Sequence, residues 1–159
     1  MAVLSKDKQR PHQGELAPRH VKLAGYTNFG GGTTAHTVYK GSAVVCDVSD
    51  TDGYGRAAPL TSSTNAASGD MLLGVSLEQQ AVTSTNTADG SVKCLVATKG
   101  IWGFAVGSLA ITDIGAIAYF SDDDTVTTTS TNNFYAGRIV DVDATYVYVD
   151  IEPYVRVPL

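Results

Sequence analysis

The most regular hydrophobic pattern of this chain lies in residues 112–151, where apolar and polar side chains alternate. In its last run, Val147, Val149 and Ile151 would share one face of a strand, and residues 146, 148 and 150 the other. A period of two is typical of a half-buried strand. β-Branched and aromatic residues fill such runs, and Asp, Asn and Gly separate them. The stretch therefore predicts strands at residues 116–120, 125–129, 134–142 and 145–151, with turns at 121–124 and 143–144.

The middle of the chain has the same character. Strands are predicted at residues 42–48, 71–77 and 91–98, and the last continues into 100–104. Residues 49–55 are rich in turn formers, whereas 61–70 and 79–90 are polar loops. A short helical turn is expected at 108–112, and no longer segment has a period of 3.6. Many short strands at close spacing predict an all-β fold, a small barrel or sandwich of short, mostly antiparallel strands.

The first forty residues differ from this pattern. Residues 1–20 contain two prolines and no periodicity, which predicts an extended tail. Three glycines at 30–32 would cradle a phosphate only if a helix followed them, and the pattern shows none, so they are interpreted as a flexible joint. The sequence thus predicts an extended basic N-terminal arm over residues 1–40 and a β body over residues 41–159.

Charge divides the 159 residues at the same place. Residues 1–40 carry six basic and two acidic side chains, a net charge of +4. The remainder carries five basic and fourteen acidic side chains, a net charge of −9. An acidic body would repel nucleic acid over its main surface. The arm is short and sparsely basic, so an acidic protein surface is the expected partner.

The two cysteines, Cys46 and Cys94, lie within apolar runs and are predicted to be buried thiols, although a disulfide is conceivable. No apolar run is long enough to span a bilayer, and the N-terminus lacks the apolar core of a secretory signal. A soluble protein made in a cytoplasm is therefore expected.

Side chains that could support catalysis are scattered. The three histidines, His12, His20 and His36, all fall in the arm, at spacings that fit no tight metal site. Neither a nucleophile elbow nor a P-loop is present in the sequence. The run 122–124 (DDD) could suggest calcium, but it lacks the alternating ligands of a calcium loop, and a solvated hairpin turn fits better. The residues disfavour an enzyme and imply no cofactor and no metal.

The single tryptophan, Trp102, stands between glycines and could stack on a ligand. A core position or an anchor in a subunit interface is the alternative. Phe104 and Tyr119 flank the same glycine-rich region, where few lysines protect sheet edges. Trp102, Phe104 and Tyr119 are therefore candidates for a subunit interface.

The order of motifs from residue 41 onward resembles a known family. KGSAVV is followed by GDMLLGVSL and by GSVKCLVATKGIW; after these come GAIAYF, an acidic turn, a threonine run and AGRIVDV before a final strand. This order, over about residues 41–152, resembles the small capsid decoration (cement) proteins of tailed bacteriophages. The resemblance implies a non-enzymatic β protein on the outer surface of an icosahedral head, which trimerises and bridges capsomers, often through an extended arm.

The leading hypothesis is thus a cement protein assembled in the host cytoplasm, with the major capsid protein and its own copies as partners. Basic residues of the arm would contact the capsid: Lys6, Lys8, Arg10, Arg19 and Lys22. The alternative is a carbohydrate-binding or adhesive β-sandwich module of a tail or cell surface, with Tyr26, Tyr54 and Trp102 as stacking platforms. An enzyme fragment is a more distant third hypothesis.

Overall fold

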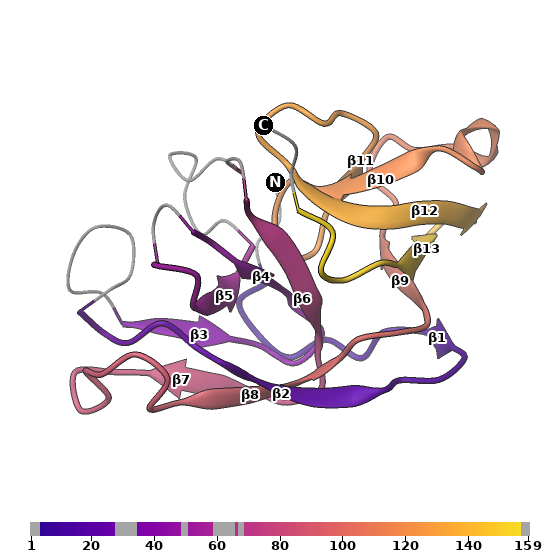
Figure 1. The fold of residues 1–159 in the computed structure, drawn as a ribbon. Helices are drawn as coiled ribbons and strands as arrows, with labels where there is room; N and C mark the ends of the chain where they lie inside the picture. Colours follow the sequence, from indigo (N-terminus) through magenta and orange to yellow (C-terminus); the bar gives the residue numbers. More distant parts are fainter. Residues whose placement is uncertain (1–3, 28–34, 49–50, 59–65, 67–68, 157–159) are drawn as a thin grey trace.

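The computed structural model describes residues 4–27, 35–48, 51–58, 66 and 69–156. Within these residues the chain forms three antiparallel sheets and one short 3₁₀ helix, η1 (Ile111–Asp113) (Figure 1). The predicted all-β fold of short antiparallel strands is confirmed. The expected helical turn at 108–112 corresponds to η1.

The largest sheet has six strands in the order β1-β9-β13-β12-β10-β11. One strand comes from the N-terminal residues and the other five from residues 101–151: β1 (His12–Gln13), β9 (Ile101–Ala105), β10 (Ile117–Phe120), β11 (Val126–Thr127), β12 (Phe134–Val142) and β13 (Tyr146–Ile151). The predicted faces of the last strand are confirmed, because Val147 and Val149 are fully buried and Ile151 is 5% exposed.

The second sheet has five strands in the order β2-β8-β6-β4-β5. They are β2 (Pro18–Lys22), β4 (Ala43–Cys46), β5 (Gly55–Ala57), β6 (Met71–Ser76) and β8 (Lys93–Ala97). A bridge between Leu23, just after β2, and Gly55 in β5 joins the two edges of this sheet, and the N–H of Ala24 donates to the Gly55 carbonyl. The sheet therefore curls into a small, nearly closed barrel. A third sheet of two strands, β3 (His36–Val38) and β7 (Gln80–Val82), lies beside it.

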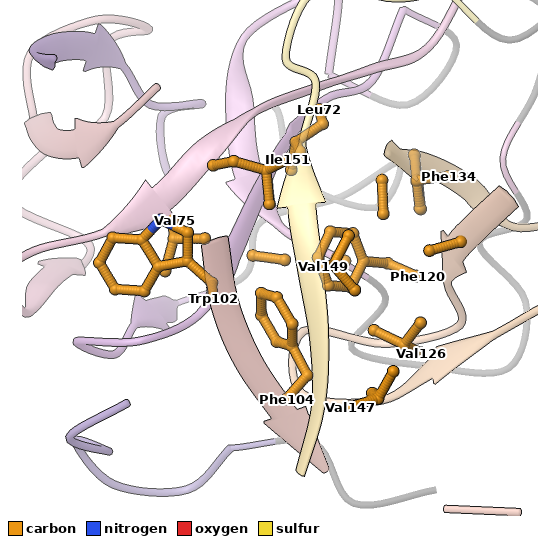
Figure 2. Close-up of a cluster of buried hydrophobic side chains, with 14 of the residues drawn as sticks. Leu72, Val75, Trp102, Phe104, Phe120, Val126, Phe134, Val147, Val149 and Ile151 are labelled. Carbon is orange, nitrogen blue, oxygen red and sulfur yellow. The ribbon is translucent and has the colours of Figure 1, made fainter. Parts of the chain in front are cut away.

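Strand β4 separates two hydrophobic cores. Ala43 and Val45 belong to the core between the barrel and the six-stranded sheet (Figure 2), whereas Val44 and Cys46 belong to the core inside the barrel. All four are at most 5% exposed. Successive side chains of a strand point to opposite faces, so a continuous apolar run such as AVVC is what a strand buried on both faces requires. Side chains of β4 thus belong to both cores, and the barrel and the six-stranded sheet pack against each other as one unit.

The N-terminal residues correct the sequence-based picture. The described part of residues 1–40 is extended, as expected, but it contributes strands β1, β2 and β3 to the sheets. Strand β2 pairs with β8 over five residues, from Pro18↔Ala97 to Lys22↔Lys93. The expectation of an aperiodic tail separate from the body is therefore wrong for the described residues. Because β2 is an edge strand with one buried side chain, Val21, its alternation was too weak to see. The glycine joint at 30–32 lies outside the described residues.

Three-residue strands account for the other differences. Strands β3, β5 and β7 were not predicted, and β7 falls within the expected polar loop 79–90. Strand β9 is separate from β8, because the chain turns at Gly100 with φ of +106°. Three residues hold too little alternation to be recognised, and β3 and β7 pair with each other from distant parts of the sequence. Most of the predicted loop 61–70 lies outside the described residues.

Candidate functional site

The turn between β10 and β11 carries three consecutive aspartates, and all three are buried. Asp122, Asp123 and Asp124 are 0%, 1% and 5% exposed. One carboxylate oxygen of Asp122 accepts hydrogen bonds from the N–H groups of Asp124 (2.8 Å) and Thr125 (2.7 Å), which closes the turn. The predicted hairpin is confirmed, but the prediction that it is solvated is wrong, because N-terminal residues cover it.

Arg10 is the residue that covers Asp124. Its Nη2 lies 2.7 Å from the carboxylate of Asp124, and the Arg10 side chain is fully buried. Lys8 Nζ lies 2.9 Å from both oxygens of the same carboxylate. The Arg10 guanidinium also lies over the ring of Phe104, 4.4 Å from its centroid. A buried guanidinium is tolerated only when it is paired and hydrogen-bonded, and Arg10 meets both conditions.

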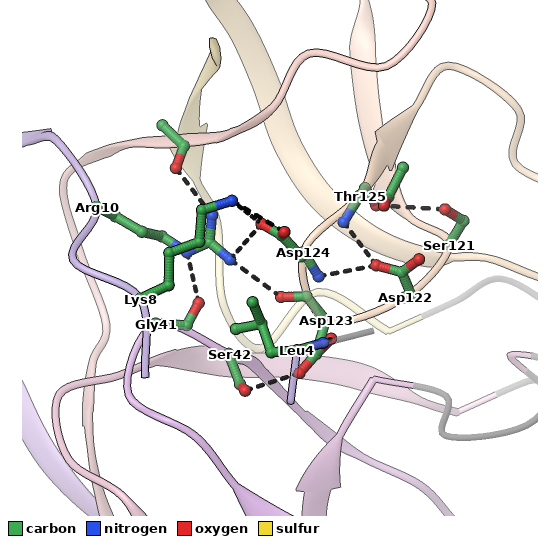
Figure 3. A network of polar contacts seen from close by, with 11 residues as sticks. Leu4, Lys8, Arg10, Gly41, Ser42, Ser121, Asp122, Asp123, Asp124 and Thr125 are labelled. Atoms are coloured by element: carbon green, nitrogen blue, oxygen red, sulfur yellow. Dashed lines mark hydrogen bonds and ion pairs between the residues drawn. The ribbon is translucent and has the colours of Figure 1, made fainter. Parts of the chain in front are cut away.

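The guanidinium of Arg10 also donates to three backbone carbonyls from separate parts of the chain (Figure 3). Nε donates to the carbonyl of Gly41, two residues before strand β4 of the barrel, and Nη1 donates to that of Gly103 in β9 of the six-stranded sheet (3.1 Å). Nη2 also donates to the carbonyl of Asp123 (3.4 Å). One side chain thereby connects the barrel, the six-stranded sheet and the acidic turn. We call residues 4–13 the N-terminal strap.

Asp123 holds the start of the strap. Its Oδ1 accepts a hydrogen bond from the N–H of Leu4 (2.9 Å), and its Oδ2 accepts one from the Ser42 hydroxyl (2.8 Å). Burial raises the pKa of Asp123 to about 6; these two hydrogen bonds oppose the rise, and the neighbouring Asp122 and Asp124 add to it. The carboxylate is thus held by hydrogen bonds rather than by a cation of its own.

The three aspartates and their partners form a cluster with a structural role. The carboxylate of Asp124 is engaged by two cations and those of Asp122 and Asp123 accept hydrogen bonds from the protein itself. The calcium interpretation gains no support, since no group of three or more His, Cys, Asp or Glu among the described residues is placed to hold a metal ion. What the cluster does is attach the N-terminal strap to both sheets.

The five predicted capsid-contact residues differ in how exposed they are. Arg10 is wrong as a surface contact, because it is buried within the chain. Lys8 is 30% exposed and paired with Asp124. Lys6, Arg19 and Lys22 are exposed, and Arg19 lies over the ring of Tyr154. For these three exposed residues, capsid contact stays a prediction.

The three candidates for a subunit interface also differ in exposure. Trp102 is 4% exposed and Phe104 is fully buried, both in the core between the sheets. Trp102 therefore has the core position that was one of its alternatives, and neither ring lies on the surface as a subunit interface would require. His12 covers Trp102 by stacking, with ring centroids 4.8 Å apart. Tyr119 is half-buried and meets Tyr135 edge to face. Of the three, Tyr119 alone keeps access to the surface.

The carbohydrate hypothesis needed Tyr26, Tyr54 and Trp102 as platforms, but the structure places them apart. Tyr26 packs against the barrel core, and Trp102 lies in the core between the sheets. Tyr54 lines an open groove of about 310 Å³ together with Arg19 and Tyr154. The three rings do not form one stacking surface.

Surface residues that the sequence reasoning missed lie near η1. Ile111, Ile114 and Ile117 are 67%, 45% and 39% exposed, and we call them the isoleucine patch. Hydrogen bonds between the backbones of residues 115–116 and Ile139 hold this loop against β12. The signal was present in the sequence, as three isoleucines within residues 111–117, which run from the expected turn at 108–112 into the expected strand at 116–120.

Both cysteines and one of the histidines are buried in the barrel region. Both cysteines are buried free thiols, as predicted, and burial raises the pKa of Cys94 to about 11. The histidines do not all lie away from the folded body. Besides His12, His36 is buried, and its Nε2 lies 3.1 Å from the carbonyl oxygen of Ala24.

Comparison with known proteins identifies no relative: no family model, no curated protein and no solved structure matches this chain. Among the described residues, no helix has the length and apolar character needed to cross a membrane.

Proposed function

We propose that this chain is a structural decoration (cement) protein, which binds the outer surface of a bacteriophage head and stabilises the shell by bridging capsomers. In this proposal it is not an enzyme. Its partners are the major capsid protein and further copies of itself in a homotrimer, and its place is the outer capsid surface of the virion. The motif order of residues 41–152 supports this function by resemblance.

The observation that carries the proposal is the isoleucine patch. Three branched apolar side chains stand exposed on η1, on the residue that follows it and at the start of β10, in a segment that the backbone of β12 holds in place. A soluble protein gains nothing in stability from such a patch, and exposed apolar clusters commonly mark surfaces that a partner protein covers. We assign the patch to the contact with the shell or with a neighbouring copy.

The N-terminal strap supports the same function in another way. A protein that bridges capsomers must carry load between its contacts without separating into parts. Arg10 and its carbonyl and carboxylate partners join the two sheets and the N-terminus into one unit. In such a unit several weak contacts act together, and their linkage raises the total affinity far above that of each contact.

Binding to heads tests the proposal. Heads purified from the source phage would be incubated with wild type, with the double variant Ile114→Asp/Ile117→Asp, and with the control Val155→Asp. Val155 is 40% exposed and lies near the C-terminus, away from the patch in sequence. We expect the double variant to lose about tenfold or more in occupancy, with the control unchanged and all three melting alike. Equal occupancy by the double variant and wild type, or no binding by wild type, would contradict the proposal.

A further inference from the structure

A groove of about 400 Å³ lies on the outer face of the six-stranded sheet, between β1 and the end of β12. We call it the acidic groove. The residues used below are Gln13, Ile101, Val140, Asp141, Asp143 and Tyr148. They come from β1, β9, β12, β13 and the turn after β12, so the sheet fixes their positions.

Two carboxylates form one wall of the acidic groove, and both are exposed. Asp143 accepts hydrogen bonds from the N–H groups of Thr145 and Tyr146, both 2.7 Å, and from the Tyr148 hydroxyl at 2.9 Å. These bonds lower the pKa of Asp143, so the carboxylate is ionised near neutrality. Asp141 accepts one hydrogen bond, from the N–H of Val142.

Lysine and arginine are absent from the lining of the acidic groove, and its one imidazole, His12 of β1, is stacked on the ring of Trp102. The nearest basic residue along β12, Arg138, stands opposite Asp150 of β13 and donates to the carbonyl of Gly115. Among the described residues, no ion pair within 4 Å includes Asp141 or Asp143. The groove therefore presents negative charge that the described part of the chain does not neutralise.

The other lining residues of the acidic groove suit the remaining parts of a lysine or arginine side chain. The bond between the Tyr148 hydroxyl and Asp143 fixes the ring beside the carboxylate, and an aromatic face next to a carboxylate attracts a guanidinium or ammonium group. Ile101 and Val140 provide apolar surface for the methylene stem of lysine or arginine. The Gln13 amide can accept a further hydrogen bond on the β1 side.

From this arrangement we infer that the acidic groove is a docking site for an arginine or lysine side chain of a partner protein. Charge selects this occupant, because the carboxylates of Asp141 and Asp143 attract a cationic side chain, whereas a neutral ligand gains no such attraction. The inference does not depend on the proposed function, since none of the three isoleucines of the patch lines the acidic groove.

The test uses an acetylated and amidated Gly-Arg-Gly-Arg-Gly peptide, titrated into the full chain at about 20 mM salt, where electrostatic attraction is weakly screened. A peptide with citrulline in place of arginine keeps the shape and removes the charge. We expect saturable binding of the arginine peptide, accompanied by a change in the Tyr148 resonances in NMR spectra, and little binding of the citrulline peptide.

Variants of matched charge locate the contact. Asp141→Asn/Asp143→Asn should weaken binding about tenfold, whereas the control Glu15→Gln/Glu152→Gln, with the same change in net charge, should weaken it about twofold or less. Asp141→Asn alone should weaken it about threefold or more, and it leaves the bonds of Asp143 intact if the double variant fails to fold. Equal losses in the two double variants, equal binding of the citrulline peptide, or no binding of the arginine peptide would overturn the inference. Binding of maltotriose that is lost in Asp141→Asn would assign the groove to saccharides and would also overturn it.

Discussion

The guanidinium of Arg10 lies 2.7 Å from the carboxylate of Asp124, in an ion pair whose arginine side chain is fully buried and whose aspartate side chain is 7% exposed. This pair attaches the N-terminal strap to the turn between β10 and β11, at the boundary between the barrel and the six-stranded sheet. Burial lowers the pKa of Arg10 from its ordinary value, and the charge of Asp124 opposes that change. The consequences can be measured.

Replacing Arg10 with methionine should lower the free energy of unfolding by about 3–5 kcal/mol, because the buried carboxylate of Asp124 would lose its main counter-charge. Lys8→Met is the matched comparison. It removes a cation from the same carboxylate at a site that is 30% exposed, and it should cost at most about 1 kcal/mol. Urea unfolding of both variants measures the difference, and equal losses would show that Arg10 does not hold the strap.

Stability should depend on pH through Asp123. Its pKa in the folded protein, about 6, is above that of an unfolded aspartate. The folded state therefore binds the proton more tightly, and the stabilisation that protonation provides is lost as pH rises from about 4 to about 6. Asp123→Asn should remove this dependence and raise the free energy of unfolding at pH 7 by on the order of 2 kcal/mol.

Unfolding free energies measured between pH 4 and pH 7.5 for wild type and Asp123→Asn give the comparison. The difference between the two proteins should grow with pH and level off above pH 6. A constant difference across this range would mean that Asp123 does not titrate there. Ser42→Ala serves as the control, since it removes one hydrogen bond to Asp123 without removing the carboxylate.

The two faces of β13 should respond differently to truncation. Val147 is fully buried, so Val147→Ala should cost about 1–3 kcal/mol from lost burial and the cavity left behind. Tyr148→Phe removes a hydroxyl whose bond to Asp143 lies at the surface, and it should cost less than about 1 kcal/mol. Thermal melts decide the point, and a larger shift for Tyr148→Phe would reverse the faces.

Gly137 should tolerate no side chain. Its φ is +144°, and a Cβ there would lie 2.0 Å from the carbonyl oxygen of Asp150 on the adjacent strand. Gly137→Ala should therefore cost more than about 3 kcal/mol or prevent folding. Gly107, with φ of +56° and open space around it, is the control, and Gly107→Ala should cost about 1 kcal/mol. Similar melting temperatures for the two variants would contradict the close approach of β12 and β13.

The alternation of apolar and polar residues along the chain was sufficient to predict many of the strands. The bounds predicted for the strand at 134–142 coincide with β12, and the inward face of β13 is the predicted one. Both follow from local geometry, because successive side chains of a strand point to opposite faces whatever the strand pairs with. The isoleucine patch could also have been found in the sequence, since its residues are close together along the chain.

The sequence by itself thus determined an all-β protein with two buried thiols, a charge division near residue 40 and the positions of its longer strands. It could not determine that the acidic turn is buried or that the N-terminal residues complete the sheets. Lys8 and Asp124 are 116 residues apart, and a charged side chain appears in a sequence as a surface residue unless its partner is known. Periodicity reports the geometry of a single strand, whereas the burial of a charge depends on which distant segment supplies its counter-charge. For that reason the tertiary structure alone decided that Arg10 and Trp102 lie inside the molecule and that Asp141 and Asp143 border an open groove.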